Sequence, residues 1–599
     1  MSRIKFTLVV LFLSVIVGIV PQASATAKPT VQVTIGGASA AWQSLALAAY
    51  SAAGAGGGHW TSASNVVDLT DSRVSPVNID AGTLWVVWNK GATKVWSYNK
   101  VDSIVGVRCY FAQPHCTVNA TSANLAGTGS NQISSSLWGD GSSDTALPAT
   151  LQSLFTTGTP VTVAATIVRP EDAAFITCRA NSQLGAGSYG GAASDGLDGL
   201  GYNSVNAPGV CPASGLGQAS GAYVGSPILS GYPKSTAAAN VLAYNISGVD
   251  PITGDAIPEY TVENVGAAPL VFITERNEGQ LTNLTNATPE QLQKVFSGAD
   301  CDAGAFGLPA GGINIFLYEG ISGIGNTAEA TLFRRPTVYT GTGTGSVLGL
   351  SQESNVGSNN PLNGQSGTCL AGAGARRRAI GSSEEVKSVQ NSGKNYGTDG
   401  IGYNVFSYGN VSTIANSSAY GYIQVNGIDP IFASYSGDDP GQPGSGTIPG
   451  SQNLPASCSG AFPCPEKDIW TGGLSFPNVR NGTYPSWAII RLLSNGTALA
   501  RSLTLITRSQ EFAVSSVPDF VPFKLTKVTG LPNDPGLTYL HSHYQQYDGA
   551  GNLIGAAPVN TTAKEAGGEV GGCIEKTTGK TEKITQSVSD SPNPCVTRP

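Results

Sequence analysis

Four short turns, rich in serine, glycine and aspartate, constrain the fold of this 599-residue chain more than any other feature. Three of them lie where an expected strand gives way to an expected helix, so they indicate an α/β chain with crossover helices. At such a point the free backbone N–H groups and the positive end of the helix dipole attract anions. The four turns are Gly36-Gly37-Ala38-Ser39, Asp102-Ser103-Ile104-Val105-Gly106, Arg169-Pro170-Glu171-Asp172-Ala173 and Glu319-Gly320-Ile321-Ser322-Gly323.

Local patterns predict the elements around these turns. Ser39 is expected to cap a helix that carries apolar residues at helical spacing from Trp42 onward. Thr288-Pro289-Glu290-Gln291 is a capping box with proline at the first helical position, and Asn89-Lys90-Gly91 predicts a hairpin turn. Strands are expected at 31–35, 84–88, 94–98, 161–168, 268–274, 313–318 and 401–406, and a further helix is expected to open at 382–385.

Residues 1–25 have the pattern of a signal peptide. Arg3 and Lys5 precede the apolar run Phe6–Val20, and Ala23-Ser24-Ala25 offers a cleavage site. The run is shorter than the roughly 20 residues of a spanning helix, so we expect no membrane anchor and a periplasmic or secreted protein. Loss of these two basic residues, with no acidic ones, changes the formal net charge from −7 to −9, which argues against a nucleic-acid partner.

Ten cysteines, all beyond the expected signal peptide, are typical of disulfides in an oxidising compartment, because they include no CxxC pair. Pairing of sequence neighbours costs the least loop-closure entropy, although sequence alone leaves other connectivities open. The expected pairs are 109–116, 178–211, 301–369, 458–464 and 573–595.

Taken in order, the turns resemble the ligand-binding turns of the phosphate-binding periplasmic proteins of ABC transporters, and the chain is identified as a divergent member of that family. Gly37-Ala38-Ser39 matches the first family turn, and the helix-opening element at 102–106 fits the second. The third presents an aspartate after a strand, here Asp172. Ser322 and Gly323 match the fourth, which reads Arg-x-x-x-Ser-Gly-Thr.

The resemblance covers about residues 31–500 and implies a two-lobed periplasmic-binding-protein type II fold of the α/β class. Lobe 1 is expected to comprise 26–265 with insertions and, after a return, 400–510; lobe 2 is expected at 266–399. Glycine-rich stretches at 181–222 and 436–462 indicate long loop insertions. Residues 511–599 are expected to form an extended C-terminal tail.

Two positions of the fourth turn depart from the family. Tyr318 stands where the family has its arginine, and Ile324 where it has threonine. Arg169 is either a substitute cation for the ligand or the partner of a neighbouring carboxylate in a salt bridge. Asp172 either accepts a hydrogen bond from a protonated oxyanion or caps a helix. Asp71 is a competing candidate for this aspartate, but it precedes the Ser103 turn and breaks the family order.

The resulting hypothesis is an exported solute-binding protein that binds a small oxyanion, foremost phosphate, in an interlobe cleft. The ligand-binding residues are expected to be Ser39, Ser103, Asp172, Ser322, Gly323 and Arg169, and the resemblance implies an ABC-transporter permease as partner. The alternative is a secreted scaffold or surface-interaction protein that keeps the fold without the ligand. Four histidines suggest no Ser/His/Asp set and no metal site, so neither enzymatic activity nor a cofactor is expected.

Overall fold

The computed structural model describes the chain in segments. They are residues 28–73, 77–168, 258, 260–275, 279–296, 298–318, 322–328, 332, 369–379, 381–406, 420–431, 476–480, 483–515, 519–523, 540–541, 571–572 and 582–583. The expected signal peptide and most of the expected tail therefore lie outside the described residues, as do Arg169 and Asp172.

A first group of strands is built around three parallel neighbours, β5, β1 and β8, of which β1 is central. β4 pairs antiparallel with β5, as the hairpin turn predicted, and β2 and β3 pair with β4. β15 closes the other side by pairing antiparallel with β8. The bounds are β1 Thr30–Gly37, β2 Gly58–Thr61, β3 Val67–Thr70, β4 Asn78–Trp88, β5 Lys94–Lys100, β6 Thr117–Asn119, β7 Thr159–Pro160, β8 Val163–Thr166 and β15 Trp487–Ser494.

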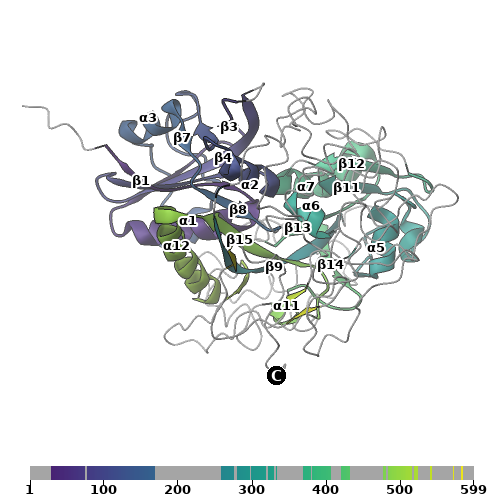
Figure 1. Ribbon diagram of the computed structural model, residues 1–599. Coiled ribbons are helices and arrows are strands. Elements are labelled where there is room, and N and C mark those ends of the chain that lie inside the picture. Colours follow the sequence, from purple (N-terminus) through teal and green to yellow (C-terminus); the bar gives the residue numbers. More distant parts are fainter. Residues whose placement is uncertain are drawn as a thin grey trace, which may run out of the picture.

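One long strand, β9 (Thr261–Glu275), joins this group to a second one (Figure 1). Its first part, through Pro269, pairs with β15, whereas Leu270 to Thr274 pair with β13. In the second group β11 lies between β12 and β13, parallel to both, and β14 pairs with the other edge of β9. The bounds are β10 Asn286–Ala287, β11 Asn314–Tyr318, β12 Ala375–Ala379, β13 Gly400–Val405, β14 Tyr420–Val425 and β16 Val521–Pro522.

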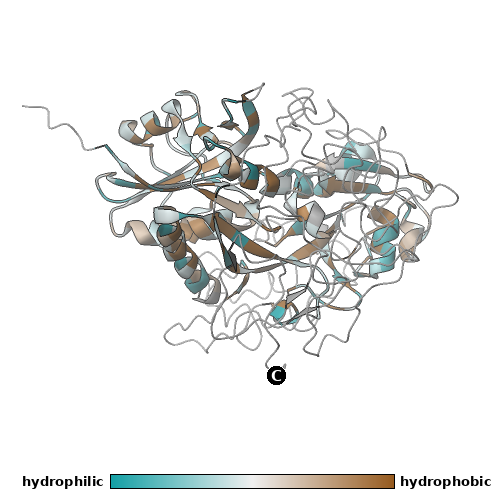
Figure 2. Cartoon of the chain, in the orientation of Figure 1, coloured by the Kyte–Doolittle hydropathy of each residue, from teal (hydrophilic) through white to brown (hydrophobic). Residues whose placement is uncertain are grey.

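Helices cover both groups. α1 packs against β4, β5 and the long helix α12, while α2 packs against β1 and β8. In the second group α7 packs against β11 and β13, and α6 bridges to β15. Figure 2 shows hydrophobic residues concentrated in the central strands, which are buried between these helices. The bounds are α1 Trp42–Ala53, α2 Ser103–Phe111, α3 Ala149–Thr157, α5 Pro289–Phe296, α6 Gly323–Ala328, α7 Gly381–Gln390, α8 Ser392–Tyr396, α11 Pro477–Arg480 and α12 Gly496–Ser515.

The mixed α/β class is therefore confirmed, and the two strand groups agree with two lobes. The strand pairings do not place the return to the first group at residue 400, where it was expected. β13 and β14 belong with β11 and the second half of β9, so the chain returns to the first group only at β15. The reason is that Gly400–Val405 continues the parallel order of the second group and needs no crossover back to the first.

Two of the expected disulfides lie in the described part of the chain, and both are formed. Cys109 pairs with Cys116 at a Cα separation of 4.8 Å, and Cys301 with Cys369 at 5.9 Å. These pairs confirm neighbour pairing at those positions, while 178–211, 458–464 and 573–595 lie outside the described residues. Among the helices that the structure describes, none is both long and apolar enough to cross a lipid bilayer.

Candidate functional site

The serine-bearing turns lie at the carboxyl ends of parallel strands. β1 leads into the 3-10 turn η1 (Ser39–Ala41) and then α1, and β5 leads into α2 at Ser103. In the second group β11 is followed by α6, whose first residue comes after Ser322, and β12 is followed by α7, which contains Ser382 in its first turn. Because parallel neighbours end at the same edge of a sheet, each group gathers its helix N-termini in one place.

The helix N-termini of the first strand group contact those of the second at Ser39 and Ser382. Their Oγ atoms are 3.0 Å apart, so one hydroxyl donates to the other between the first and the second strand group. Ser39 was expected to cap the first helix, and this expectation is wrong. Ala38 is the N-cap of η1 and Ala41 that of α1, and neither cap forms a side-chain hydrogen bond, so the serine hydroxyl is directed to α7 instead.

A second contact joins Ser103 to Gly323. A methyl group placed on Gly323 would lie 2.1 Å from the Ser103 Oγ and 2.8 Å from the Ile167 Cγ1, so only glycine permits this approach. The Ser103 hydroxyl also accepts a hydrogen bond of 3.4 Å from the Ile167 backbone N–H. Ser103 is consequently only 2% exposed.

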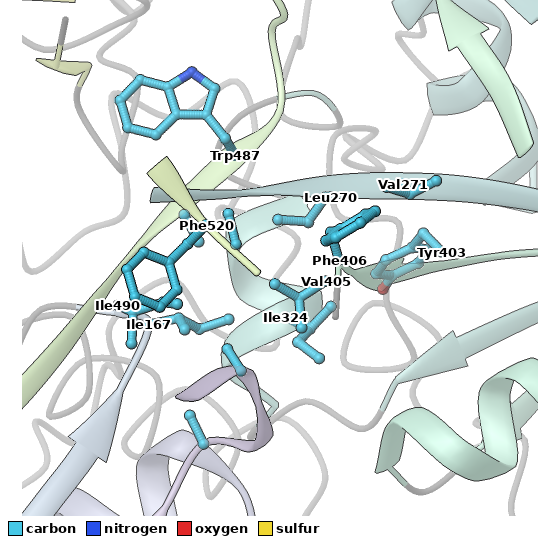
Figure 3. Close-up of a cluster of buried hydrophobic side chains, with 14 of the residues drawn as sticks. Ile167, Leu270, Val271, Ile324, Tyr403, Val405, Phe406, Trp487, Ile490 and Phe520 are labelled. Carbon is cyan, nitrogen blue, oxygen red and sulfur yellow. The ribbon is translucent and has the colours of Figure 1, made fainter. Parts of the chain in front are cut away.

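The Ser322 side chain caps the helix that follows it. It is fully buried, and its Oγ accepts a hydrogen bond of 3.3 Å from the Gly325 N–H, which makes it the side-chain cap of α6. The next apolar residue, Ile324, belongs to the buried hydrophobic cluster that also contains Ile167 and Ile490 (Figure 3). The fourth turn therefore meets the first strand group through the apolar contacts of Ile324 and the close approach of Gly323 to Ser103.

Tyr318, which was expected to stand at the family's arginine position, lies at the end of β11 and is 1% exposed. Its hydroxyl donates to the Asn404 Oδ1 at 3.0 Å, and the Asn404 Nδ2 donates to the Ser382 carbonyl at 3.2 Å. Burial raises the pKa of Tyr318 well above its usual value, and the negative charges of Glu385 and Asp102 raise it further. Tyr318 is therefore a neutral hydrogen-bonding group at neutral pH.

Lys100 is a cation beside this site that the motifs did not indicate. It is the last residue of β5, it pairs with Gly37 of β1, and the Ser103 turn follows it directly. Its Nζ lies 4.8 Å from the centre of the Trp42 ring at the start of α1. Desolvation lowers the pKa of Lys100 to about 8, and within the described part of the chain no carboxylate forms an ion pair with it. Such a desolvated ammonium group favours a nearby anion.

The expected residues thus divide into two sets. Ser39, Ser103, Ser322 and Gly323 lie where the two strand groups meet, whereas Arg169 and Asp172 lie outside the described residues. The competing Asp71 accepts hydrogen bonds from Arg73 at 2.9 and 2.7 Å and contacts Arg108, so its carboxylate serves an internal ion-pair cluster. Ser382, expected only as part of a helix start, is the residue that Ser39 contacts.

The structure also brings together three residues that the sequence analysis did not associate. His59, Asp144 and Ser142 form a hydrogen-bonded chain in the first strand group, away from the serine turns in sequence. The sequence analysis did not anticipate this hydrogen-bonded chain. His59 is 83 positions from Ser142 and 85 from Asp144 in the sequence, and the loop that carries them lies along β2, where the Thr145 N–H donates to the His59 carbonyl at 3.0 Å.

No protein-family model matches this sequence, and no curated protein matches it. Solved structures with a distant likeness include a phosphate-binding protein from Stenotrophomonas maltophilia, which is 13% identical with a TM-score of 0.32 over 84% of this chain and 86% of that chain. A putative phosphate ABC transporter substrate-binding protein from Clostridium perfringens is 13% identical with a TM-score of 0.24, over 43% and 72%. An ABC-type phosphate transport receptor from Vibrio cholerae is 11% identical with a TM-score of 0.22, over 43% and 73%.

Proposed function

We propose that this chain is an exported solute-binding protein that holds a small oxyanion, foremost phosphate, between its two strand groups without transforming it. The observation that carries the proposal is the 3.0 Å contact between Ser39 and Ser382, because it brings the N-terminal ends of α1 and α7 together. Ser103 opens α2, whose Gly106 lies against Gly36 and Gly37 shortly before Ser39. The N-terminal ends of α1, α2 and α7 each offer backbone N–H groups and the positive end of a helix dipole.

An anion bound here would displace the Ser39–Ser382 hydrogen bond and accept a hydrogen bond from each of the two serine hydroxyls. Tyr318 is a further neutral donor at the edge of the same network, and Lys100 supplies positive charge. The carboxylates of Asp102 and Glu385 lie close enough to act on Tyr318. They disfavour a fully ionised ligand, so a protonated oxyanion such as hydrogen phosphate fits better than sulfate.

The alternative function, a secreted scaffold that has lost the ligand, is favoured by a different observation. Ile324 and Ile167 belong to one buried cluster (Figure 3). Gly323 lies against Ser103 without space for a methyl group. Apolar contacts of this kind stabilise the two groups against each other without any ligand. Loss of the family's charged clamp at Tyr318 points in the same direction.

A thermal-shift titration separates the two functions. Phosphate that binds only the native protein raises its stability by RT ln(1 + [L]/Kd), or about 2.7 kcal/mol at a hundredfold excess over Kd. We expect a rise in melting temperature with millimolar phosphate, a smaller one with sulfate and none with glucose. Absence of a phosphate shift would leave the scaffold as the function.

Two variants test whether the shift comes from this site. Ser39→Ala and Ser103→Ala each remove a hydroxyl donor, so each should reduce the phosphate-induced shift. Ser153→Ala is the matched control, because Ser153 is an exposed serine of α3 whose hydroxyl only donates to the Thr150 carbonyl of its own helix. An equal reduction of the phosphate-induced shift in all three variants would mean that phosphate does not bind at this site.

A further inference from the structure

A hydrogen-bonded chain of a hydroxyl, an imidazole and a carboxylate lies in the first strand group, at β2. His59 of β2 contacts the Asp144 Oδ1 through its Nδ1 at 2.9 Å. Its other nitrogen, Nε2, is 2.9 Å from the Ser142 Oγ. A nucleophile in contact with a base that a third group orients is the arrangement that activates serine toward carbonyl compounds.

Asp144 has the surroundings of an orienting carboxylate. Besides His59 it accepts hydrogen bonds from the backbone N–H groups of Thr61 and Asn131, each at 2.9 Å, and from the Thr61 hydroxyl. Burial alone would raise the pKa of Asp144, but the hydrogen bonds from His59, Thr61 and Asn131 hold it below its usual value. An ionised Asp144 favours the His59 tautomer that carries its proton on Nδ1, and in that tautomer the Nε2 lone pair faces Ser142.

The imidazole is held rigidly, whereas the serine is accessible. His59 is 1% exposed, stacks on Trp138 at a centroid distance of 3.8 Å and meets the edge of Tyr50 at 5.0 Å. Ser142 is partly exposed and follows Gly141, whose φ of 72° lies in the left-handed region. Ser142 is therefore the accessible end of this chain, while Trp138 and Tyr50 cover the imidazole ring behind it.

Asp140 gives this site its charge. Its Oδ1 accepts hydrogen bonds from the Ser142 N–H at 2.9 Å and from the Ser142 hydroxyl at 2.5 Å, and its Oδ2 accepts one from the Tyr50 hydroxyl at 2.6 Å. The Ser142 proton is thus shared between two acceptors, Asp140 and His59. A carboxylate this close to the hydroxyl repels an anionic substrate and leaves uncharged acyl compounds as the compatible class.

We infer that Ser142 is a nucleophile, activated by His59 and positioned through Asp144, that hydrolyses small uncharged carboxylic esters. The activity is separate from the proposed oxyanion site, since it shares none of the residues assigned there.

The reaction conserves atoms and protons. The Ser142 Oγ attacks the ester carbonyl carbon while its proton passes to the His59 Nε2, which then protonates the departing alkoxide to give the alcohol. Water next attacks the acyl-serine carbonyl and gives its proton to the same nitrogen. Return of that proton to the Ser142 Oγ releases the carboxylic acid and restores the site.

Covalent labelling of the folded full chain tests the nucleophile directly. A fluorophosphonate probe should label Ser142, identified by peptide mass spectrometry, and the protein should hydrolyse p-nitrophenyl acetate. Ser142→Ala should remove both signals, whereas Ser143→Ala, in the neighbouring exposed serine, should retain them. Failure of the folded wild-type protein to label at Ser142, or hydrolysis undiminished in Ser142→Ala, would overturn the inference.

Two further variants separate activation from a structural role. His59→Gln should lower the labelling rate about a hundredfold or more, because it removes the base. Asp140→Asn replaces the charged competing acceptor with a weaker neutral one and removes the negative charge, so it should raise the labelling rate, an effect that loss of a structural contact would not produce. If Asp140→Asn remains folded and labels more slowly than the wild type, the assignment of His59 as the activating base is contradicted.

Discussion

The hydroxyls of Ser39 and Ser382 lie 3.0 Å apart although 343 positions separate the two residues in the sequence. Ser39 follows the central strand of the first group, and Ser382 stands in the first turn of the helix that covers the second. Their contact is therefore a measure of how closely the two groups approach each other, and the proposed anion would bind at this point.

A double-mutant cycle should show that the two hydroxyls are energetically coupled. Ser39→Ala and Ser382→Ala remove the same hydrogen bond, so the double variant should be less destabilised than the sum of the single ones, by about 0.5–1.5 kcal/mol. Urea unfolding without phosphate measures this coupling. Strict additivity would mean that the contact contributes nothing to holding the two groups together.

Introducing a cation at position 318 should tighten phosphate binding. In Tyr318→Arg a guanidinium group can make charge-assisted hydrogen bonds, worth about 1.5–3 kcal/mol, or roughly ten- to a hundredfold in affinity. The nearby charges of Asp102 and Glu385 would stabilise the new cation in the free protein. Isothermal titration calorimetry with phosphate measures the gain.

Tyr318→Phe is the matched control for this variant. It keeps the ring but removes the hydroxyl that donates to Asn404, so it should give no gain in affinity. A folded Tyr318→Arg protein that binds phosphate no better than Tyr318→Phe would show that position 318 does not correspond to the family's arginine.

Lys100 should make stability rise with pH in the alkaline range. Its pKa is lowered to about 8 from 10.5, so between these values the unfolded chain binds more protons than the folded one. Above pH 10.5 Lys100 is neutral in both the folded and the unfolded chain, and its burial costs no stability. As the pH falls toward 8 the unfolded chain takes up the proton first, so the free energy of unfolding decreases. Compared with Lys100→Met, the wild-type protein should therefore gain stability between pH 8 and 10, as melting temperatures measure. A constant difference between the two proteins would contradict a desolvated ammonium group.

The two described disulfides should differ in their contribution to stability. In the chain-entropy model, the closed loop of 68 positions between Cys301 and Cys369 restricts the unfolded chain more than the loop of 7 between Cys109 and Cys116. The expected contributions are about 4 and about 2 kcal/mol. Paired Cys→Ser variants, compared by denaturant unfolding, test the order, and a larger loss from the shorter loop would refute the entropic explanation.

Features that depend on neighbours within a few positions could be predicted from the sequence. The capping box is one: the Thr288 N–H donates to the Gln291 Oε1 at 2.8 Å, and the Gln291 N–H donates to the Thr288 Oγ1 at 3.2 Å. The hairpin around Asn89-Lys90-Gly91 is another, and β11 ends where the fourth turn was expected to begin. These signals are local because a helix start or a tight turn is closed by residues three to five positions apart.

Ser39 shows where local reasoning fails. A serine ahead of an apolar helix is usually its cap, yet this hydroxyl contacts Ser382. That choice depends on β12 lying parallel to β11 and on β9 pairing with both β15 and β13, none of which a window of neighbouring residues contains.

The sequence by itself therefore determined the α/β class, most element types and the position of the serine turns, because hydrophobic period and capping chemistry are local. Only the tertiary structure decided which side chains meet. Ser39 with Ser382, Ser103 with Gly323, and His59 with Ser142 and Asp144 are brought together across dozens to hundreds of positions. Such contacts follow from strand order and from the burial of whole faces, which are properties of the folded chain rather than of any segment.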